Sequence, residues 1–174
     1  MAEEAKLTKP PKQATGKDAE MMAEFEKAMG TAFVEAKFLR ERSIMLTVKA
    51  AALLKAVQWM KQEWGLYHVS TITGMDLQKQ IAILYHFDVK ETTVTVKVVV
   101  PTANPEVDSI TQLIPGATLY EREVFDMLGV RFKGHPKLER LLLPEDFPKR
   151  VYPLRKDWQS PRQDKPEKPQ KPEK

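Results

Sequence analysis

Cysteine is absent from the 174 residues. Disulfides, cysteine-ligated zinc, iron–sulfur ligation and thiol chemistry are therefore excluded within this chain. The sequence also lacks any run of 18 apolar residues that could span a bilayer, and its first residues contain no apolar segment of the kind found in a secretory signal. These absences predict a protein of the cytosol or of a cytosol-facing surface.

The charge of the chain is mixed rather than concentrated. The formal net charge is +4 and the pI is about 9.2, but Lys and Arg alternate with Asp and Glu throughout. A nucleic-acid-binding protein typically shows a concentrated basic face with stacking aromatic residues, so this pattern disfavours nucleic acid as a partner. High Lys and Glu with a single Asn is typical of heat-adapted proteins, although nine Gln count against that interpretation.

Residues 121–157 combine dense charge and proline with large apolar residues at intervals. A solvated tail would not need Phe125, the three consecutive residues Leu141 to Leu143, or Tyr152. A self-contained core would not place so many charged residues between them. The composition predicts a docking segment that begins as a helix and continues, from residue 131, as an extended arm on another protein. Four prolines between residues 136 and 153 exclude a long helix in the arm.

Apolar periodicity before this segment predicts an α+β fold of two layers, with a mainly antiparallel sheet and helices on one face. Asp18 is a candidate N-cap for the first helix, and Gly residues at 30, 65 and 129 are candidate helix ends. Helices are expected over residues 18–29, 50–64, 109–113 and 119–128, strands over 31–39, 43–49, 66–72, 79–89 and 93–100, and a turn over 73–76. The expected organisation is a flexible lead-in at 1–17, an α+β domain at 18–118, a helix and docking arm at 119–158, and a disordered Pro/Lys/Glu tail at 159–174.

Candidate catalytic or metal-binding groups are few. The three histidines, His68, His86 and His135, show no ligand spacing, although the first two lie on neighbouring expected strands and could meet. Glu121, Glu123 and Asp126 offer carboxylates on one helix that could act as acid and base in a cleft. Because no nucleophile or second catalytic set accompanies them, ion pairing with a partner or with the arginines of the arm is the favoured interpretation. No P-loop or dinucleotide-binding glycine motif occurs.

The same segment resembles the 30 kDa subunit family of complex I, which is found in the bacterial NADH–quinone oxidoreductases. The residues that carry the resemblance are Glu121-Arg122-Glu123, Asp126, Met127-Leu128-Gly129, Phe132, Gly134-His135-Pro136, Arg140, Leu141 to Leu143, Pro144-Glu145-Asp146 and Pro153-Leu154-Arg155-Lys156-Asp157. Glu139 departs from the family pattern, which usually has a basic residue there. The α+β domain before the segment fits the family's fold in outline.

The resemblance implies a non-catalytic subunit in the peripheral arm of a membrane-bound, ion-pumping respiratory complex, on the cytoplasmic face of the cell membrane. Its implied partners are a hydrogenase-like large subunit and an iron–sulfur small subunit. Iron–sulfur clusters, and a nickel–iron centre where the complex is a hydrogenase, are expected in those partners, with no cofactor or metal in this chain. The resemblance and the composition favour a membrane-bound hydrogenase or a sulfur-reducing complex over an NADH or F420H2:quinone enzyme. The residues expected at the partner interface are Glu121, Arg122, Glu123, Asp126, Phe132, His135, Pro136, Arg140, Leu141, Leu142, Leu143, Pro144, Glu145, Asp146, Phe147, Tyr152, Pro153, Leu154, Arg155, Lys156 and Asp157.

Overall fold

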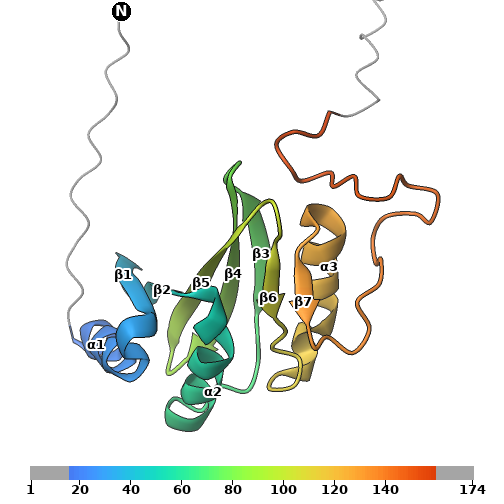
Figure 1. Cartoon of the computed structure of the whole chain (residues 1–174). Helices are drawn as coiled ribbons and strands as arrows, with labels where there is room; N and C mark the ends of the chain where they lie inside the picture. Colours follow the sequence, from blue (N-terminus) through green and yellow to red (C-terminus); the bar gives the residue numbers. More distant parts are fainter. Residues whose placement is uncertain (1–15, 160–174) are drawn as a thin grey trace, which may run out of the picture.

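The computed structural model describes residues 16–159, which form one sheet of five strands with helices packed on it (Figure 1). The expected lead-in at 1–17, except for its last two residues, and the expected tail at 159–174, except for its first, lie outside the described residues. The helices are α1 (Lys17–Met29), α2 (Leu53–Glu63) and α3 (Thr118–Leu128), with short 3-10 turns η1 (Gly30–Ala32), η2 (Ala50–Ala52) and η3 (Pro115–Ala117). The strands are β1 (Phe33–Arg40), β2 (Ser43–Val48), β3 (Thr71–Asp76), β4 (Gln80–Val89), β5 (Thr92–Pro101), β6 (Glu106–Asp108) and β7 (Arg131–Lys133).

The five-stranded sheet has the order β1-β2-β5-β4-β3, and its two hairpins, β1–β2 and β4–β5, form as the alternating patterns predict. Its β3–β4 pair is also antiparallel, whereas β2 and β5 run parallel in the middle of the sheet. The expectation that all neighbours would pair antiparallel is therefore wrong at this one place. The reason is that β2 leads into η2 and α2, which cross over before the chain returns to the sheet.

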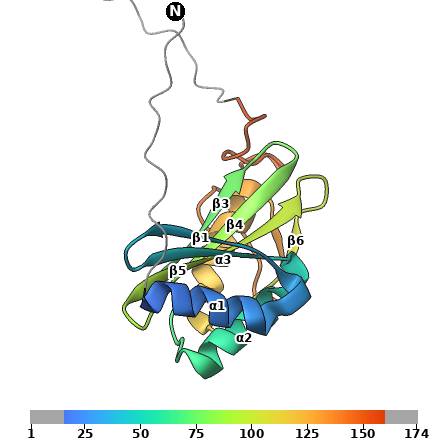
Figure 2. The ribbon, with the colours of Figure 1, turned by 90° about the vertical axis from the view of Figure 1, so that its left-hand side faces the viewer.

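All three helices pack on one face of the sheet, which confirms the predicted two-layer α+β fold. Side chains that are partners in the sheet register share this face, and they include Leu46, Val96 and Tyr85, all fully buried. Figure 2 shows α1 and α2 lying along this face, and α3 covers it at β3. Phe25 of α1 and Trp64 after α2 belong to the same core. Burial of this apolar face is the main stabilising contribution of the domain.

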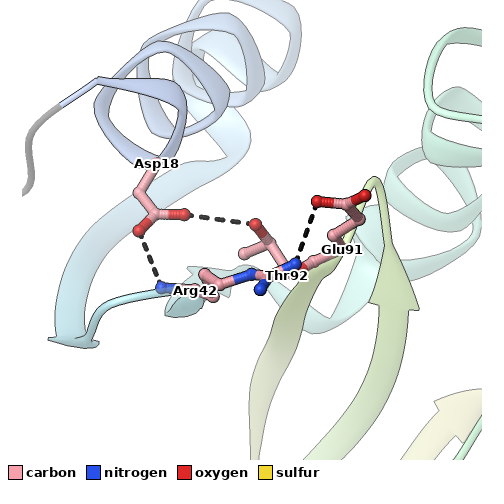
Figure 3. A network of polar contacts seen from close by, with 4 residues as sticks. All are labelled: Asp18, Arg42, Glu91 and Thr92. Carbon is pink, nitrogen blue, oxygen red and sulfur yellow. Dashed lines mark hydrogen bonds and ion pairs between the residues drawn. The ribbon is translucent and has the colours of Figure 1, made fainter.

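Helix α1 is fixed to the sheet by Asp18, but not as an N-cap. The helix begins at Lys17, and no side chain caps it. Instead, the Asp18 carboxylate accepts hydrogen bonds from the backbone N–H of Arg42 at 2.9 Å and from the hydroxyl of Thr92 at 3.2 Å (Figure 3). The Arg42 side chain then donates to the Glu91 carboxylate at 2.9 Å. Asp18 therefore joins the helix to the two hairpin turns at one end of the sheet.

Gly74 marks the place where α3 comes closest to the sheet. A turn was expected over residues 73–76 because glycine commonly ends strands, but this prediction is wrong, since Thr71–Asp76 is strand β3. A β-carbon on Gly74 would collide with the side chain of Leu128 and press on that of Val124. The glycine is needed because a helix packs directly on its strand. The actual turn follows at residues 77–79, where the Gln78 N–H bonds the Asp76 carboxylate at 2.6 Å.

The expected helix over residues 109–113 is also absent from the described chain, where this segment is a turn. The preceding residues form β6, which pairs in parallel with β7 just after α3. The Ser109 hydroxyl, expected to cap a helix, instead donates to the Glu121 carboxylate at 2.6 Å. The chain thus adds a small second sheet, β6–β7, that anchors both ends of α3, and the Lys133–Glu106 ion pair at 2.7 Å bridges its strands.

Helix α3 ends as predicted at Gly129, which has a left-handed φ of 75°. After β7 the described chain, residues 134–159, continues in turns and extended backbone without a helix. Within residues 16–159 no helix is both long and apolar enough to cross a bilayer. The domain boundaries at 118 and 119 remain a prediction, although α3 packs on β3 and contributes Val124 and Leu128 to the core.

Candidate partner-docking site

The arm, defined here as residues 134–159, lies along its own helix α3. Three helix residues spaced four apart, Thr118, Arg122 and Asp126, face it, because residues at this spacing share one side of a helix. The Thr118 carbonyl lies 3.1 Å from Nε2 of His135, and the Arg122 guanidinium donates to the backbone carbonyls of residues 139 and 140 at 3.1 and 2.7 Å. The arm therefore runs parallel to α3, from its first turn toward its last.

His135 holds the first turn of the arm. Its Nδ1 accepts a hydrogen bond from the backbone N–H of Lys137 at 3.0 Å, while Nε2 faces the Thr118 carbonyl. A neutral ring with its proton on Nε2 satisfies both contacts. These bonds fit the prediction that His135 and Pro136 fix a turn rather than handle protons.

Asp126 receives the next part of the arm. A single oxygen, Oδ2, accepts the backbone N–H groups of Leu141, Leu142 and Leu143 at 3.1, 2.9 and 2.9 Å. Successive N–H groups directed at one point form an anion-binding concavity. Burial acts to raise the pKa of Asp126, but these three N–H donors and the charge of Arg140 together hold the pKa below its ordinary value. The carboxylate is therefore ionised at neutral pH and binds the backbone as an anion.

Arg140 closes the following loop of the arm. Its guanidinium donates to the carbonyls of Pro144, Phe147 and Pro148 at 3.2, 2.7 and 3.1 Å, and lies 6.0 Å from the centre of the Phe147 ring. Prolines lack the N–H that would let this segment bond itself, and the planar fork of arginine reaches several carbonyls at once. One side chain thus fixes the shape of residues 140–148.

The arm returns to the C-terminal end of α3 at residues 152–156. The N–H of Leu154 and Nε of Arg155 donate to the last helix carbonyls, those of Met127 at 3.2 Å and Leu128 at 2.8 Å, which the helix itself leaves without partners. The Arg155 guanidinium also lies over the Tyr152 ring, 4.6 Å from its centre. The N–H of Lys156 donates to the Asp76 carboxylate at the end of β3 at 2.8 Å.

Asp76 is the second carboxylate that binds arm backbone. The bond from Lys156 lowers its pKa, burial opposes that change, and the N–H of Gln78 with the charges of Arg155 and Lys156 adds to the lowering. Asp76 thus joins the end of strand β3 to the end of the arm.

These contacts leave three arm leucines turned away from the domain. Leu141, Leu142 and Leu154 are 37%, 58% and 57% exposed, although each has a backbone N–H bonded to the domain. Phe147, Tyr152 and Leu143 are half-buried against the arm itself. Large apolar side chains on a firmly attached backbone are what an interface anchor requires.

The structure gives part of the predicted interface an internal place instead. Glu121 is 0% exposed, and Asp126 and Phe132 are buried in the chain, so these side chains have no free surface to meet a partner. Arg122, Arg140 and Arg155 direct their donors to the carbonyls of this chain. The direct contacts remain a prediction for the exposed members of the segment, which are Glu123, Pro136, Leu141, Leu142, Pro144, Glu145, Asp146, Leu154, Lys156 and Asp157.

The three carboxylates of α3 do not form a catalytic set, because they point to different surroundings. Glu123 is exposed, Asp126 binds the arm, and Glu121 lies in the core with bonds from the Ser109 hydroxyl and, at 2.8 Å, the Ile110 N–H. Burial raises the pKa of Glu121 to about 7 against the pull of those two bonds. A raised pKa was expected of an acid–base catalyst, but full burial of Glu121 gives a substrate no access.

The histidines do not meet. His86 lies on the helix-free face of the sheet, where its ring bonds Thr73 at 3.2 Å and Thr95 at 3.0 Å on the two flanking strands. Burial lowers its pKa, with Asp88 opposing that effect. His68 lies in the segment before β3, so the expectation that these two could meet on neighbouring strands has no support. Over residues 16–159 no three His, Asp or Glu side chains are grouped as a metal site requires.

Comparison with known families gives a match over residues 46–164 to the respiratory-chain NADH dehydrogenase 30 kDa subunit. This chain belongs to that family. The match begins within β2 and contains β3 to β5, α3 and the whole arm, so the family assignment includes the contacts described above. The resemblance seen in residues 121–157 is therefore confirmed.

Members of the 30 kDa subunit family that resemble this chain come from different complexes. The NADH-quinone oxidoreductase subunit of this type from Moorella thermoacetica is 39% identical over 119 residues, which cover 65% of this chain and 78% of that protein. Formate hydrogenlyase subunit 5 of Escherichia coli is 36% identical over 126 residues, 69% of this chain but 22% of that protein. A chain in the structure of the membrane-bound sulfane sulfur reductase, an archaeal respiratory membrane complex, matches with a TM-score of 0.72 and 28% identity, covering 83% of this chain and 86% of that one.

Two features of this 30 kDa family member were missed by sequence reasoning. The first is the Thr118, Arg122 and Asp126 stripe, whose spacing of four was visible but whose partner, the arm backbone, was not. The second is Asp76, which was placed in a turn and instead binds the end of the arm. A lone carboxylate at the end of a strand carries no sequence signal for a contact 80 residues away.

Proposed function

We propose that this chain is a non-catalytic peripheral-arm subunit of a membrane-bound, ion-pumping respiratory complex related to complex I, at the cytoplasmic face of the membrane. The arm docks on the hydrogenase-like large subunit, and the iron–sulfur small subunit is the second partner. Iron–sulfur clusters, and a nickel–iron centre where one is present, belong to those partners. The observation that carries the proposal is the exposure of Leu141, Leu142 and Leu154 on a backbone that the domain holds in place.

Two kinds of complex compete within this proposal. A hydrogen-evolving or sulfur-reducing complex is favoured by the structural similarity to a sulfane sulfur reductase chain and by the formate hydrogenlyase relative. An NADH or F420H2:quinone oxidoreductase is the alternative, and the 39% identical NADH-quinone oxidoreductase relative from Moorella thermoacetica supports it. The heat-adapted composition agrees with the first choice but does not separate the two.

The deciding experiment is purification of the tagged chain from detergent-solubilised membranes of its own cells, followed by mass spectrometry and metal analysis. We expect a hydrogenase-like large subunit and an iron–sulfur subunit at a constant ratio to the tagged chain. Nickel would indicate a hydrogenase, and iron with neither nickel nor an NADH-oxidising flavoprotein would indicate the sulfur-reducing type. A flavoprotein module would establish the quinone enzyme instead. Recovery of the chain alone, under conditions that keep membrane complexes intact, would refute the docking role.

A further inference from the structure

The contact between Asp126 and the leucines is unusual in its geometry. One carboxylate oxygen binds the N–H groups of three consecutive residues, so the backbone of Leu141 to Leu143 curves around that oxygen. The neighbouring loop is closed independently by Arg140, whose guanidinium binds three carbonyls of residues 144–148. The direction of the leucine side chains is therefore set by one helix residue together with one loop residue.

Burial separates what the carboxylate holds from what remains available. Asp126 is 3% exposed, whereas Leu141 and Leu142, whose N–H groups it binds, are 37% and 58% exposed. Asp126 also lies outside the apolar core, on the side of α3 that faces the arm, while Val124 and Leu128 face the sheet. Loss of its charge should therefore disturb the arm far more than the domain.

We propose that Asp126 is a positioning residue for docking, which acts on the partner through Leu141 and Leu142 and not by direct contact. This inference rests on the proposed docking function. Three charge-assisted bonds to one loop fix the leucines in a single arrangement, so that the loop does not have to be ordered anew when the partner binds. In Asp126→Asn, the charge is lost and the amide group can present an N–H to backbone groups that are themselves donors.

The test is a double-mutant cycle on incorporation into the native complex. Each tagged variant is expressed beside the untagged native chain. The variant-to-native ratio in the complex-sized fraction is then divided by the same ratio in the free pool. We expect Asp126→Asn and Leu142→Ala each to lower this quotient by at least about tenfold. The double variant should fall by much less than the product of the two, because Asp126 has nothing left to position at that leucine.

Leu154→Ala provides the matched control, since Leu154 is equally exposed but is held by Met127 rather than by Asp126. Its effect should multiply with that of Asp126→Asn. Multiplication between Asp126→Asn and Leu142→Ala as well, or normal incorporation of Asp126→Asn, would overturn the inference. If neither leucine variant alone changed incorporation, the docking function itself would fail, and that result is distinct from the first two.

A second measurement separates positioning from general damage. Thermal unfolding of the isolated Asp126→Asn chain should stay close to that of the native chain, since the core is untouched. In the assembled complex, backbone amide exchange at residues 141–143 should be faster in the variant, with exchange in the sheet unchanged. Faster exchange throughout the domain would show that Asp126 supports the fold, and unchanged exchange at all three leucines would show that it does not hold the arm.

Discussion

The ring of Tyr152 lies against Gly129, on the side of the backbone where a β-carbon would stand. Gly129 also has a left-handed φ of 75°, so two independent requirements exclude a side chain at this position. The end of α3 and the return of the arm are therefore joined at a single residue.

Gly129→Ala should lower the free energy of unfolding by at least about 1 kcal/mol from backbone strain alone, and displace Tyr152 in addition. Denaturant unfolding measures the first effect. Gly116→Ala is the control, because its β-carbon would meet open space and its φ is not left-handed. In a Tyr152→Ala background the strain should remain while the clash disappears. An equal cost of Gly129→Ala in both backgrounds would contradict the contact with Tyr152.

Glu121→Gln should make the protein more stable above pH 7 and flatten its stability between pH 4.5 and 7. Burial raises the pKa of Glu121 from 4.5 to about 7, so the fold favours the protonated form. The native protein therefore has this contribution in full below pH 4.5 and loses it as the pH rises to about 7, by at most about 3 kcal/mol. Gln keeps the shape and can still bond Ser109 and Ile110.

Denaturant unfolding of both proteins at several pH values gives the comparison for Glu121. The native curve should fall across that window relative to the variant. Asp76 and Asp126 have lowered pKa values, so their contributions are present above about pH 4 and disappear only in stronger acid. Glu123→Gln, at an exposed carboxylate of the same helix, should leave the curve unchanged. Parallel curves for the native protein and Glu121→Gln would show that Glu121 is ionised in the fold.

Leu142→Ala should weaken assembly by about 2 to 4 kcal/mol while leaving the thermal unfolding of the isolated chain nearly unchanged. The reason is that Leu142 is largely exposed in this chain and would be buried only by the partner. Val34→Ala, at an equally exposed apolar residue on edge strand β1, tests whether any exposed apolar residue has the same effect. Equal losses for Val34 and Leu142 would remove the special status of the arm.

Arg155→Ala should release the last part of the arm and reduce assembly, because Arg155 bonds the Leu128 carbonyl and covers the Tyr152 ring. Co-purification of the complex with the variant chain measures the effect. Arg155→Lys should restore little, since an ammonium group cannot reproduce the flat stacking on the ring. Normal assembly and activity of the complex with Arg155→Ala would remove the residue from the docking role.

Trypsin should cut the isolated chain at Lys149 and Arg150, which are exposed in a turn between the two attached parts of the arm. The same sites should be protected in the complex. From sequence, all of residues 120–158 were expected to be protease-sensitive, but the first nine of these form α3 and are packed on the sheet. Early cleavage within α3, such as at Arg122, would contradict this narrower prediction. Mass spectrometry of the first fragments locates the cuts.

Local patterns predicted the parts of the fold that depend on neighbouring residues. Alternation at residues 79–89 and 93–100 predicted β4 and β5, and helical spacing predicted α2 and α3. The prediction failed where a distant contact decides the structure. Gly74 resembles a turn residue until α3 is seen against it, and Ser109 resembles an N-cap until Glu121 is seen to take its hydroxyl.

The candidate site was predicted as a segment but not as an arrangement. Composition identified residues 121–157, and the exposed leucines are where an interface anchor was expected. The charges were assigned to ion pairs with a partner because a sequence shows charge but not the backbone groups that satisfy it. In the structure, Asp126, Arg140 and Arg155 bind main-chain atoms of this chain. Main-chain partners carry no sequence signal, so this part could not be predicted.

The arm is bound to its domain mainly through peptide groups, which every residue supplies. Arg122 takes the main-chain oxygen at position 139, so the glutamate there, unusual for the family, leaves that bond intact. Sequence change at most arm positions can therefore alter the outward surface without altering the path of the chain. A family with this construction can exchange one partner for another by replacing surface side chains, while a few fixed carboxylates and arginines keep the same scaffold.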